Sequence, residues 1–319
     1  MIFKKDQAFK YSDLEMFGEI DDYENPQGTV CMVTRNDGKM LFCEKFTNES
    51  QNGFFMSTSN ARNFGIGKLR NDKYNGCLFS RDTNGVLSID FYEDDKIIGP
   101  QLILEPNMIC IAVEAPNGVK LIKYQKGVLN YGALYDMDKV FHVTPISENI
   151  NLDFNFKDSE IYLRPYRFDS SLDSLVKTTY KHYTQKMDYY NQYGYGYIKW
   201  DDGDFALSEF YLGDRHGLGC YRWPNGDEYI GQFKFNKATG LGVYSEYNKK
   251  YYIGVFENKV KNGTFIEVDK YTLWIKKYSN NSQIGQYFKL DLNTFDLTHY
   301  FENGTSKFYS FAELYDDFI

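Results

Sequence analysis

Residues 193–268 read YGYGYIKWDDGDFALSEFYLGDRHGLGCYRWPNGDEYIGQFKFNKATGLGVYSEYNKKYYIGVFENKVKNGTFIEV, and one interval recurs throughout this stretch. Glycines mark the interval in two columns: Gly194, Gly217, Gly240 and Gly263, then Gly196, Gly219 and Gly242. The same step separates Phe210, Phe233 and Phe256, and the pairs Trp200/Trp223, Tyr229/Tyr252 and Gly231/Gly254. Self-similarity at a fixed period of about 20–50 residues is typical of repeat architectures. We therefore interpret the stretch as a series of repeat units, each running from one leading glycine to the next.

Each unit predicts one β-hairpin. Residues 218–223 are a short apolar and aromatic run, and residues 228–235 alternate apolar and polar side chains as a half-buried strand does. Between them, Asn225-Gly226 is the dipeptide typical of a type I′ turn, which needs positive φ at both central residues. Residues 236–239 then return the chain to the next leading glycine, Gly240.

Neighbouring hairpins are expected to pair edge to edge, because a single hairpin is not stable in water. The third residue after each leading glycine is apolar or aromatic: Tyr197, Cys220, Val243 and Ile266. We expect this column to form a buried face. Glycine permits positive φ and close approach of a neighbouring backbone or ring. We therefore assign a structural role to the repeat glycines: Gly194, Gly217, Gly219, Gly231, Gly240, Gly242, Gly254 and Gly263.

The N-terminal part shows the same spacing less regularly. Gly53, Gly76 and Gly99 are separated by the same interval, and the third residues after them, Met56, Phe79 and Leu102, are apolar. Residues 15–110 therefore predict about four degenerate hairpins of the same kind.

These segments resemble MORN repeats, a family with the pattern Y-x-G-x-F, G-x-G and Asn-Gly. GDRHGLGCYRWPNGDEYIGQF and YIGQFKFNKATGLGVYSEY carry the resemblance, which is clear over 194–268 and degenerate over 15–110. Ser208 and Phe265 depart from the pattern, because each stands where a repeat glycine is expected. The resemblance implies an architecture more than an activity, since MORN proteins act as scaffolds, oligomerise or are suggested to contact lipid.

Two helices are predicted outside the hairpins. Residues 169–192 place apolar side chains at helical spacing after Asp169 or Ser170 as N-cap, which predicts an inserted helix that covers a sheet or binds a partner. Ser310 and Glu313 form a capping box, which predicts a short helix over 310–319. This helix would cover the last edge of the array or dock onto a partner.

The predicted fold is therefore all-β. We expect an elongated, twisted antiparallel sheet of stacked MORN-type hairpins, interrupted by one helix and capped by a second. The segments predicted in order are a degenerate hairpin array over 1–110, irregular hairpins over 111–168, the helix over 169–192, the clear array over 193–309 and the capping helix over 310–319.

Composition limits the partners. The net charge is −8 and the pI about 5.2, so no broad basic surface for nucleic acid is expected. The basic residues are scattered, which disfavours anionic membrane lipid. There is no signal-peptide core or apolar run long enough to span a membrane, and the five cysteines form no C-x-x-C pair. We expect reduced cysteines and a cytoplasmic location.

Catalytic motifs are missing from the sequence. The four histidines, at 142, 182, 216 and 299, lack the spacing of zinc ligands, and His216 lies in a predicted turn. Neither a nucleophile motif nor a phosphate-binding glycine loop is found. We therefore predict no catalytic residue, no metal and no cofactor, with an enzyme site within residues 108–190 as the remaining alternative.

Aromatic side chains are the candidates for binding, since the chain has 29 tyrosines and 26 phenylalanines. The predicted function is a non-enzymatic scaffold that binds a protein partner, or itself as a homodimer, along the groove of the sheet. The alternative is a small-molecule module for a nucleotide or sugar, with an aromatic pocket near the inserted helix. The candidate binding residues are Trp200, Trp223, Tyr229, Tyr252 and Tyr183.

Overall fold

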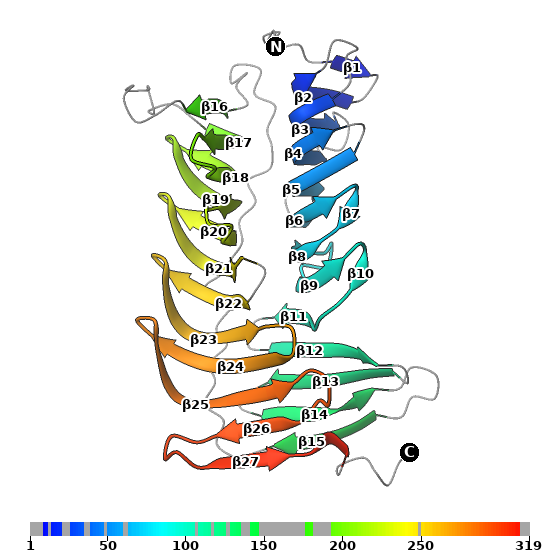
Figure 1. Ribbon diagram of the computed structural model, residues 1–319, viewed down its shortest axis with the longest axis vertical. Coiled ribbons are helices and arrows are strands. Elements are labelled where there is room, and N and C mark those ends of the chain that lie inside the picture. Colours follow the sequence, from blue (N-terminus) through cyan, green and yellow to red (C-terminus); the bar gives the residue numbers. More distant parts are fainter. Residues whose placement is uncertain are drawn as a thin grey trace. The chain divides into compact units, whose positions relative to one another are not determined.

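A computed structural model gives the fold (Figure 1). It describes residues 9–11, 14–20, 26–34, 39–47, 50–59, 63–105, 108–115, 118–125, 128–134, 141–146, 176–180, 193–247 and 250–312. Contacts divide the chain into two compact units. Unit 1 comprises Met1–Ile98 and Ile161–Lys237, and unit 2 comprises Gly99–Glu160 and Ala238–Ile319. The predicted division into five segments stays a prediction, since the units group residues by packing and not by repeat.

Unit 1 holds two runs of strands. The first run is β1 (Phe9–Tyr11), β2 (Leu14–Ile20), β3 (Pro26–Thr34), β4 (Met40–Thr47), β5 (Ser50–Ser59), β6 (Asn63–Arg70), β7 (Lys73–Tyr74), β8 (Gly76–Arg81), β9 (Leu87–Glu93) and β10 (Lys96–Ile97). The second run is β16 (Val176–Tyr180), β17 (Tyr193–Trp200), β18 (Phe205–Tyr211), β19 (Asp214–Arg222) and β20 (Glu228–Lys234). Pairing follows chain order and is antiparallel, except that β16 lies parallel to β17 and that β8 pairs with β6 past the short β7.

Unit 2 has the same organisation. Its first run is β11 (Gln101–Glu105), β12 (Met108–Ala115), β13 (Gly118–Gln125), β14 (Val128–Leu134) and β15 (Phe141–Ile146). Its second run is β21 (Lys237–Glu246), β22 (Lys250–Glu257), β23 (Val260–Val268), β24 (Thr272–Ser279), β25 (Ser282–Asp291), β26 (Leu297–Tyr300) and β27 (Ser306–Tyr309). The chain is therefore all-β with antiparallel sheets, as the sequence predicts.

The predicted helices are not confirmed. The described part of residues 169–192 is β16, so the helix is wrong for Val176–Tyr180; the rest lies outside the described residues. Valine, threonine and tyrosine lose side-chain freedom in a helix and favour strands, which explains the error. At the C-terminus only Phe311 and Ala312 are helical among the described residues, and 313–319 lie outside them. In the part that the structure describes, no helix is long and apolar enough to cross a membrane.

The hairpin of the repeat is confirmed, but its turn is not of the predicted type. β19 and β20 pair from Gly217↔Phe233 to Arg222↔Glu228. At the connecting loop Trp223 N–H donates to Asp227 O at 2.9 Å, and Gly226 has positive φ whereas Asn225 does not. Pro224 and Asn225 therefore form a longer loop that ends in a left-handed glycine, not a two-residue type I′ turn.

Two-residue turns with positive φ at both positions lie at other strand ends. They are Asn71-Asp72, Asp94-Asp95, Leu212-Gly213, Phe235-Asn236, Asn258-Lys259 and Asn280-Asn281. In four of them the second side chain accepts a hydrogen bond from a backbone N–H about one repeat earlier: Asp72 from Gln51 at 2.7 Å, Asp95 from Tyr74 at 2.7 Å, Asn236 from Arg215 at 2.9 Å and Asn281 from Lys261 at 2.8 Å. Each of these turns is thereby tied to its neighbour in the stack.

The predicted apolar column is buried. Tyr197, Cys220, Val243 and Ile266 are each 2% exposed or less. In unit 1 this face packs against the first run of strands, where the Tyr197 ring lies 5.6 Å from Phe42. In unit 2, Tyr131 of β14 stacks at 5.5 Å on Phe295, between β25 and β26. In each unit the apolar face of one run of strands packs against the other run. The sequence predicted a single sheet. Packing two runs together removes from water an apolar face that a single sheet would expose.

Candidate functional site

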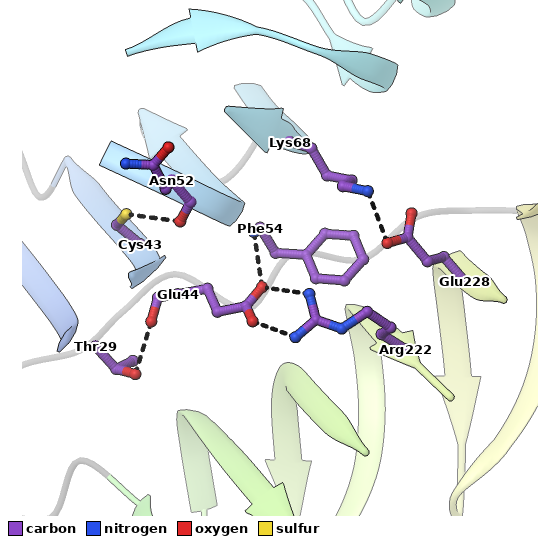
Figure 2. A network of polar contacts seen from close by, with 8 residues as sticks. All are labelled: Thr29, Cys43, Glu44, Asn52, Phe54, Lys68, Arg222 and Glu228. Atoms are coloured by element: carbon purple, nitrogen blue, oxygen red, sulfur yellow. Dashed lines mark hydrogen bonds and ion pairs between the residues drawn. The ribbon is translucent and has the colours of Figure 1, made fainter. Parts of the chain in front are cut away.

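A chain of charged residues joins the two runs of unit 1 (Figure 2). Arg222 of β19 donates to both carboxylate oxygens of Glu44 in β4, and the Nη1–Oε2 distance is 3.0 Å. Lys68 of β6 pairs with Glu228 of β20 at 2.8 Å. Between the pairs, the Arg222 guanidinium lies 5.6 Å from the ring of Phe54, within range of a cation–π contact.

Local backbone geometry positions Glu44. The register of β4 against β5 shifts between Cys43 and Lys45, so Glu44 occupies a β-bulge. Its Oε2 accepts the backbone N–H of Phe54 at 2.9 Å, and Thr29 Oγ1 donates to its carbonyl at 2.8 Å. Gly53 has φ of +78° and no Cβ, and an added Cβ would lie 2.7 Å from Glu44 Oε2. Glycine at 53 therefore leaves room for the buried carboxylate.

The pairing shapes the pKa values of this network. Burial raises the pKa of Glu228 more than the charge and hydrogen bond of Lys68 lower it. Burial lowers the pKa of Arg222, but the hydrogen bond and charge of Glu44 outweigh burial and raise it. Burial also raises the pKa of the nearby Cys220 thiol. With both cations paired and the thiol held neutral, the network fixes the two runs against each other and offers no free nucleophile.

Two predicted binding residues meet on the other face of the second run. Trp200 lies 5.8 Å from the Tyr221 ring and Trp223 lies 4.8 Å from the same ring. The Arg215 guanidinium sits 4.3 Å from the centre of Tyr221. Tyr221 was missed from the sequence, although it stands one repeat before Tyr244 in the same column.

The other predicted aromatic residues differ in exposure. Tyr229 is 2% exposed and donates its hydroxyl to Gln232 O at 3.0 Å, so it belongs to the core. Tyr252, its equivalent one repeat later, is half-buried and donates to Glu246 Oε1 at 2.9 Å. Tyr183 lies outside the described residues.

Several repeat glycines are required by packing. Gly217 has φ of +97°, and a Cβ there would overlap the carboxylate of Glu209. A Cβ on Gly219 would overlap the hydroxyl of Ser208, and one on Gly254 would lie 2.8 Å from the Phe265 ring. Ser208 and Phe265, which depart from the repeat pattern, thus face glycines that leave them space.

The exposed apolar residues at the hairpin turns were also missed. Leu212 is 42% exposed and Phe235 is 49% exposed, and both have positive φ. The Phe235 ring packs at 4.9 Å on His216, which lies 5.5 Å from the ring of Tyr211. We call these four residues the turn edge: Tyr211, Leu212, His216 and Phe235. The only signal in the sequence is an apolar residue directly before Gly213 and directly before Asn236, at the ends of two predicted strands.

Cavities and metal ligands add little. Among the described residues, no group of three or more His, Cys, Asp or Glu side chains could hold a metal ion. A hollow of about 430 Å³ in unit 2 is lined by Lys277, Ile284, Gly285, Gln286, Phe301, Glu302 and Gly304. None of the predicted binding residues lines this hollow.

Comparisons with known proteins bear on the repeat. No curated protein matches the chain in sequence. Among solved structures, the TCP10 domain of Danio rerio CPAP in complex with a peptide of Danio rerio STIL is similar at 9% identity, over 92% of this chain and 99% of that chain. Its TM-score is 0.24, so nothing is concluded from this likeness. A family model described as MORN repeat matches residues 208–228 and 229–245. The chain therefore contains two MORN repeats, over the centre of the stretch in which its sequence resembles that family.

Proposed function

We propose that this protein is a non-enzymatic scaffold that binds a protein partner through the turn edge of its two MORN repeats. MORN repeats suggest an interaction or scaffold role, and the matched residues 208–245 contain the whole turn edge. The absence of catalysis, cofactor and metal and the cytoplasmic location stay predictions from the sequence.

The observation that carries the proposal is the residue type at two turn positions. Leu212 and Phe235 open type I′-like turns at φ of 52° and 48°. The equivalent first positions of the other turns hold Asn71, Asp94, Asn258 and Asn280, which tolerate positive φ. An apolar residue with positive φ is strained by about 1 kcal/mol or more, and at these exposures it also leaves apolar surface in water. Local rules are broken in this way at functional or strained sites. Phe295 also has positive φ but is buried in the core, whereas Leu212 and Phe235 are exposed and have no such packing role.

The arrangement of the turn edge suits a protein ligand. Leu212 and Phe235 stand one repeat apart, and ring contacts run from Tyr211, the chain neighbour of Leu212, through His216 to Phe235. Aromatic and apolar anchors of this kind carry much of the free energy of protein–protein association. A small molecule would need an enclosed pocket, and the hollow of about 430 Å³ in unit 2 is lined by none of these residues.

The test is a double substitution, Leu212→Asn with Phe235→Asn. Asparagine suits positive φ, so we expect the variant to fold at least as stably as the wild type. Affinity purification from the native host, with quantitative mass spectrometry, should show the partner depleted more than tenfold in the variant. Tyr247→Asn, which removes a different exposed aromatic side chain at a turn, is the control and should retain the partner.

Light scattering of the purified protein distinguishes self-association. If the wild type is a dimer and the double variant is a monomer, the partner at the turn edge is a second copy of this chain. If the double variant retains every partner and the same mass, the turn edge is not an interaction site and the proposal fails.

A further inference from the structure

A ring of lysines and aromatic side chains lies on one face of β22–β24 in unit 2. Glu267 is 1% exposed and receives three donors: Lys250 at 2.5 Å, Lys276 at 3.0 Å and the Tyr278 hydroxyl. Lys250 lies 4.5 Å from the centre of the Trp274 ring. We refer to six residues as the lysine cluster: Lys250, Lys261 and Lys276, with the rings of Tyr252, Trp274 and Tyr278.

The cluster holds more positive charge than its carboxylates require. The carboxylate of Glu267 is already satisfied by two ammonium groups and a hydroxyl. Within the part of the chain that the structure describes, Lys261 forms no ion pair. Its Nζ instead lies 4.3 Å and 4.1 Å from the centres of the Tyr252 and Tyr278 rings. Even with Glu246 counted, three ammonium groups face two carboxylates.

The excess of positive charge affects the pKa of Lys261. Burial lowers the pKa of Lys261, the charge of Glu267 opposes this, and the like charges of Lys250 and Lys276 lower it further. A bound anion near the cluster would relieve that repulsion. The excess is notable because the whole chain carries a net charge of −8.

The face that carries the cluster is a sheet surface and not a phosphate cradle. Tyr252, Glu267 and Trp274 are cross-strand partners, and side chains one position along, such as Ile253 and Ile266, are buried on the opposite face. Backbone N–H groups of these strands bond in the plane of the sheet, so they are not directed at a ligand above it. Phosphate sites typically combine lysine with such backbone donors or use the fork of arginine. Lysines spread over three strands beside aromatic rings suit several carboxylates presented on an extended chain.

We infer that the lysine cluster is a docking site for an acidic segment of a protein partner, with Lys261 as a direct contact to a carboxylate. The inference extends the proposed scaffold role to a second site with its own chemistry, and it does not use the turn edge.

The probe is fluorescein-labelled hexaglutamate, with binding followed by fluorescence anisotropy at about 50 mM NaCl and again at about 300 mM, where screening weakens such contacts. We expect salt-sensitive binding by the wild-type protein. Lys261→Gln should weaken it about tenfold, the loss expected for one charge-assisted contact. Lys261 has no ion pair to lose, so the melting temperature of its variant should fall by no more than a few degrees, the cost of its two cation–π contacts.

Lys259→Gln is the matched control, since it removes one exposed lysine from the adjoining turn and should change the affinity less than twofold. The Leu212→Asn/Phe235→Asn protein should bind the peptide as the wild type does, so failure of the turn-edge proposal and failure of this one are distinguishable. No binding by the wild type, or equal losses at 259 and 261, would overturn the inference. So would competition by inorganic phosphate at the concentration at which glutamate peptide itself competes, because the cluster would then be a site for small oxyanions.

Discussion

Units 1 and 2 contain the same kind of hairpin but bury charge in different places. In unit 1, Glu44 and Glu228 lie between two runs of strands and are each paired with one cation from the opposite run. In unit 2, Glu267 lies on one face of a single run and receives two lysines from neighbouring strands. Between its runs, unit 2 has a contact of aromatic rings, Tyr131 with Phe295 and Phe311.

The difference separates two uses of a charged position in a repeat. Charges that face the other run are matched one to one, so they specify which strands meet and add little attraction beyond that. Charges on the free face of a run need not be matched within the chain. Excess charge on such a face is then available to a partner, as we infer for the lysine cluster.

The largest effect is expected from breaking the pairing in unit 1. Arg222→Ala leaves the buried Glu44 carboxylate without its cation, which should lower the free energy of unfolding by about 3–5 kcal/mol. Urea denaturation followed by tryptophan fluorescence measures this, since Trp200 and Trp223 lie in unit 1. Arg70→Ala breaks the exposed pair with Asp94 and should not shift the midpoint measurably.

A double substitution shows whether the charges themselves are needed. Glu44→Gln with Arg222→Met removes both charges and keeps similar volumes, so it should recover most of the lost stability. If the double variant is as unstable as Arg222→Ala, packing of the arginine stem on Phe54 and not charge pairing holds the runs together.

Glu267→Gln tests the charge balance in unit 2. At pH 7 it should lower the free energy of unfolding by about 2–3 kcal/mol, because it removes a buried hydrogen-bonded charge. Burial opposes ionisation of Glu267, but hydrogen bonds from Lys250, Tyr278 and Lys276 outweigh it and lower its pKa. A lowered folded pKa means that the contribution is present above the unfolded pKa and is lost as pH falls through the folded pKa. The gap between wild type and Glu267→Gln should therefore close in acid.

Glu228 should behave with the opposite sign. Its pKa is raised, chiefly by burial, so its contribution is present below the unfolded pKa and is lost as pH rises through the folded pKa. Glu228→Gln should lose its relative disadvantage at neutral pH, in contrast to Glu267→Gln. The measurement is the free energy of unfolding of both variants, relative to the wild type, over the same range of pH. If the two differences change with pH in the same direction, this contrast between the units is wrong.

The sequence was informative where the repeat imposes a backbone requirement. Gly217, Gly240 and Gly263 all have positive φ, a conformation that favours glycine, so the period could be found in one sequence. Cys220 and Ile266 are buried because the column faces the other run, which the apolar pattern indicated. These features depend on neighbours within one or two repeats, so the spacing of residues along the sequence is enough to predict them.

Packing between distant segments could not be predicted in this way. Arg222 and Glu44 are far apart in the chain, and nothing in the local pattern of either links them. The turn at 225–226 was mistaken because Asn-Gly is the stronger dipeptide signal, whereas Phe235-Asn236 looks like the end of a strand. Phe235, the apolar residue that made this turn look like a strand end, is one of the two residues on which the proposed function rests.

Gly217 and Gly263 occupy one repeat column in different units and give a smaller, matched effect. Both have positive φ, but a Cβ on Gly217 would meet buried Glu209 whereas one on Gly263 would meet nothing within 4 Å. Gly263→Ala should therefore cost about 1 kcal/mol of unfolding free energy, from the backbone alone. Gly217→Ala should cost clearly more, about 2–3 kcal/mol, because the carboxylate must also move. Equal losses would mean that the crowding at 217 is relieved without cost.

The smallest effect concerns the bonds that tie one hairpin turn to the next. Asn236 accepts the N–H of Arg215, whereas Lys259, one repeat later, contributes only its backbone N–H to Ala238 O at 2.8 Å. Lys259→Asn supplies the missing acceptor at a φ of 74° that asparagine tolerates, so it should raise the free energy of unfolding by about 0.5–1 kcal/mol. Asn236→Ala should lower it by at least as much, because it loses the bond and places alanine at positive φ.

Urea midpoints of the two variants should move in opposite directions. Amide exchange at Ala238 should slow only in Lys259→Asn, because the new bond protects that amide and no other. If Ala238 exchanges as in the wild type, the side chains at these turns terminate hairpins but do not connect them.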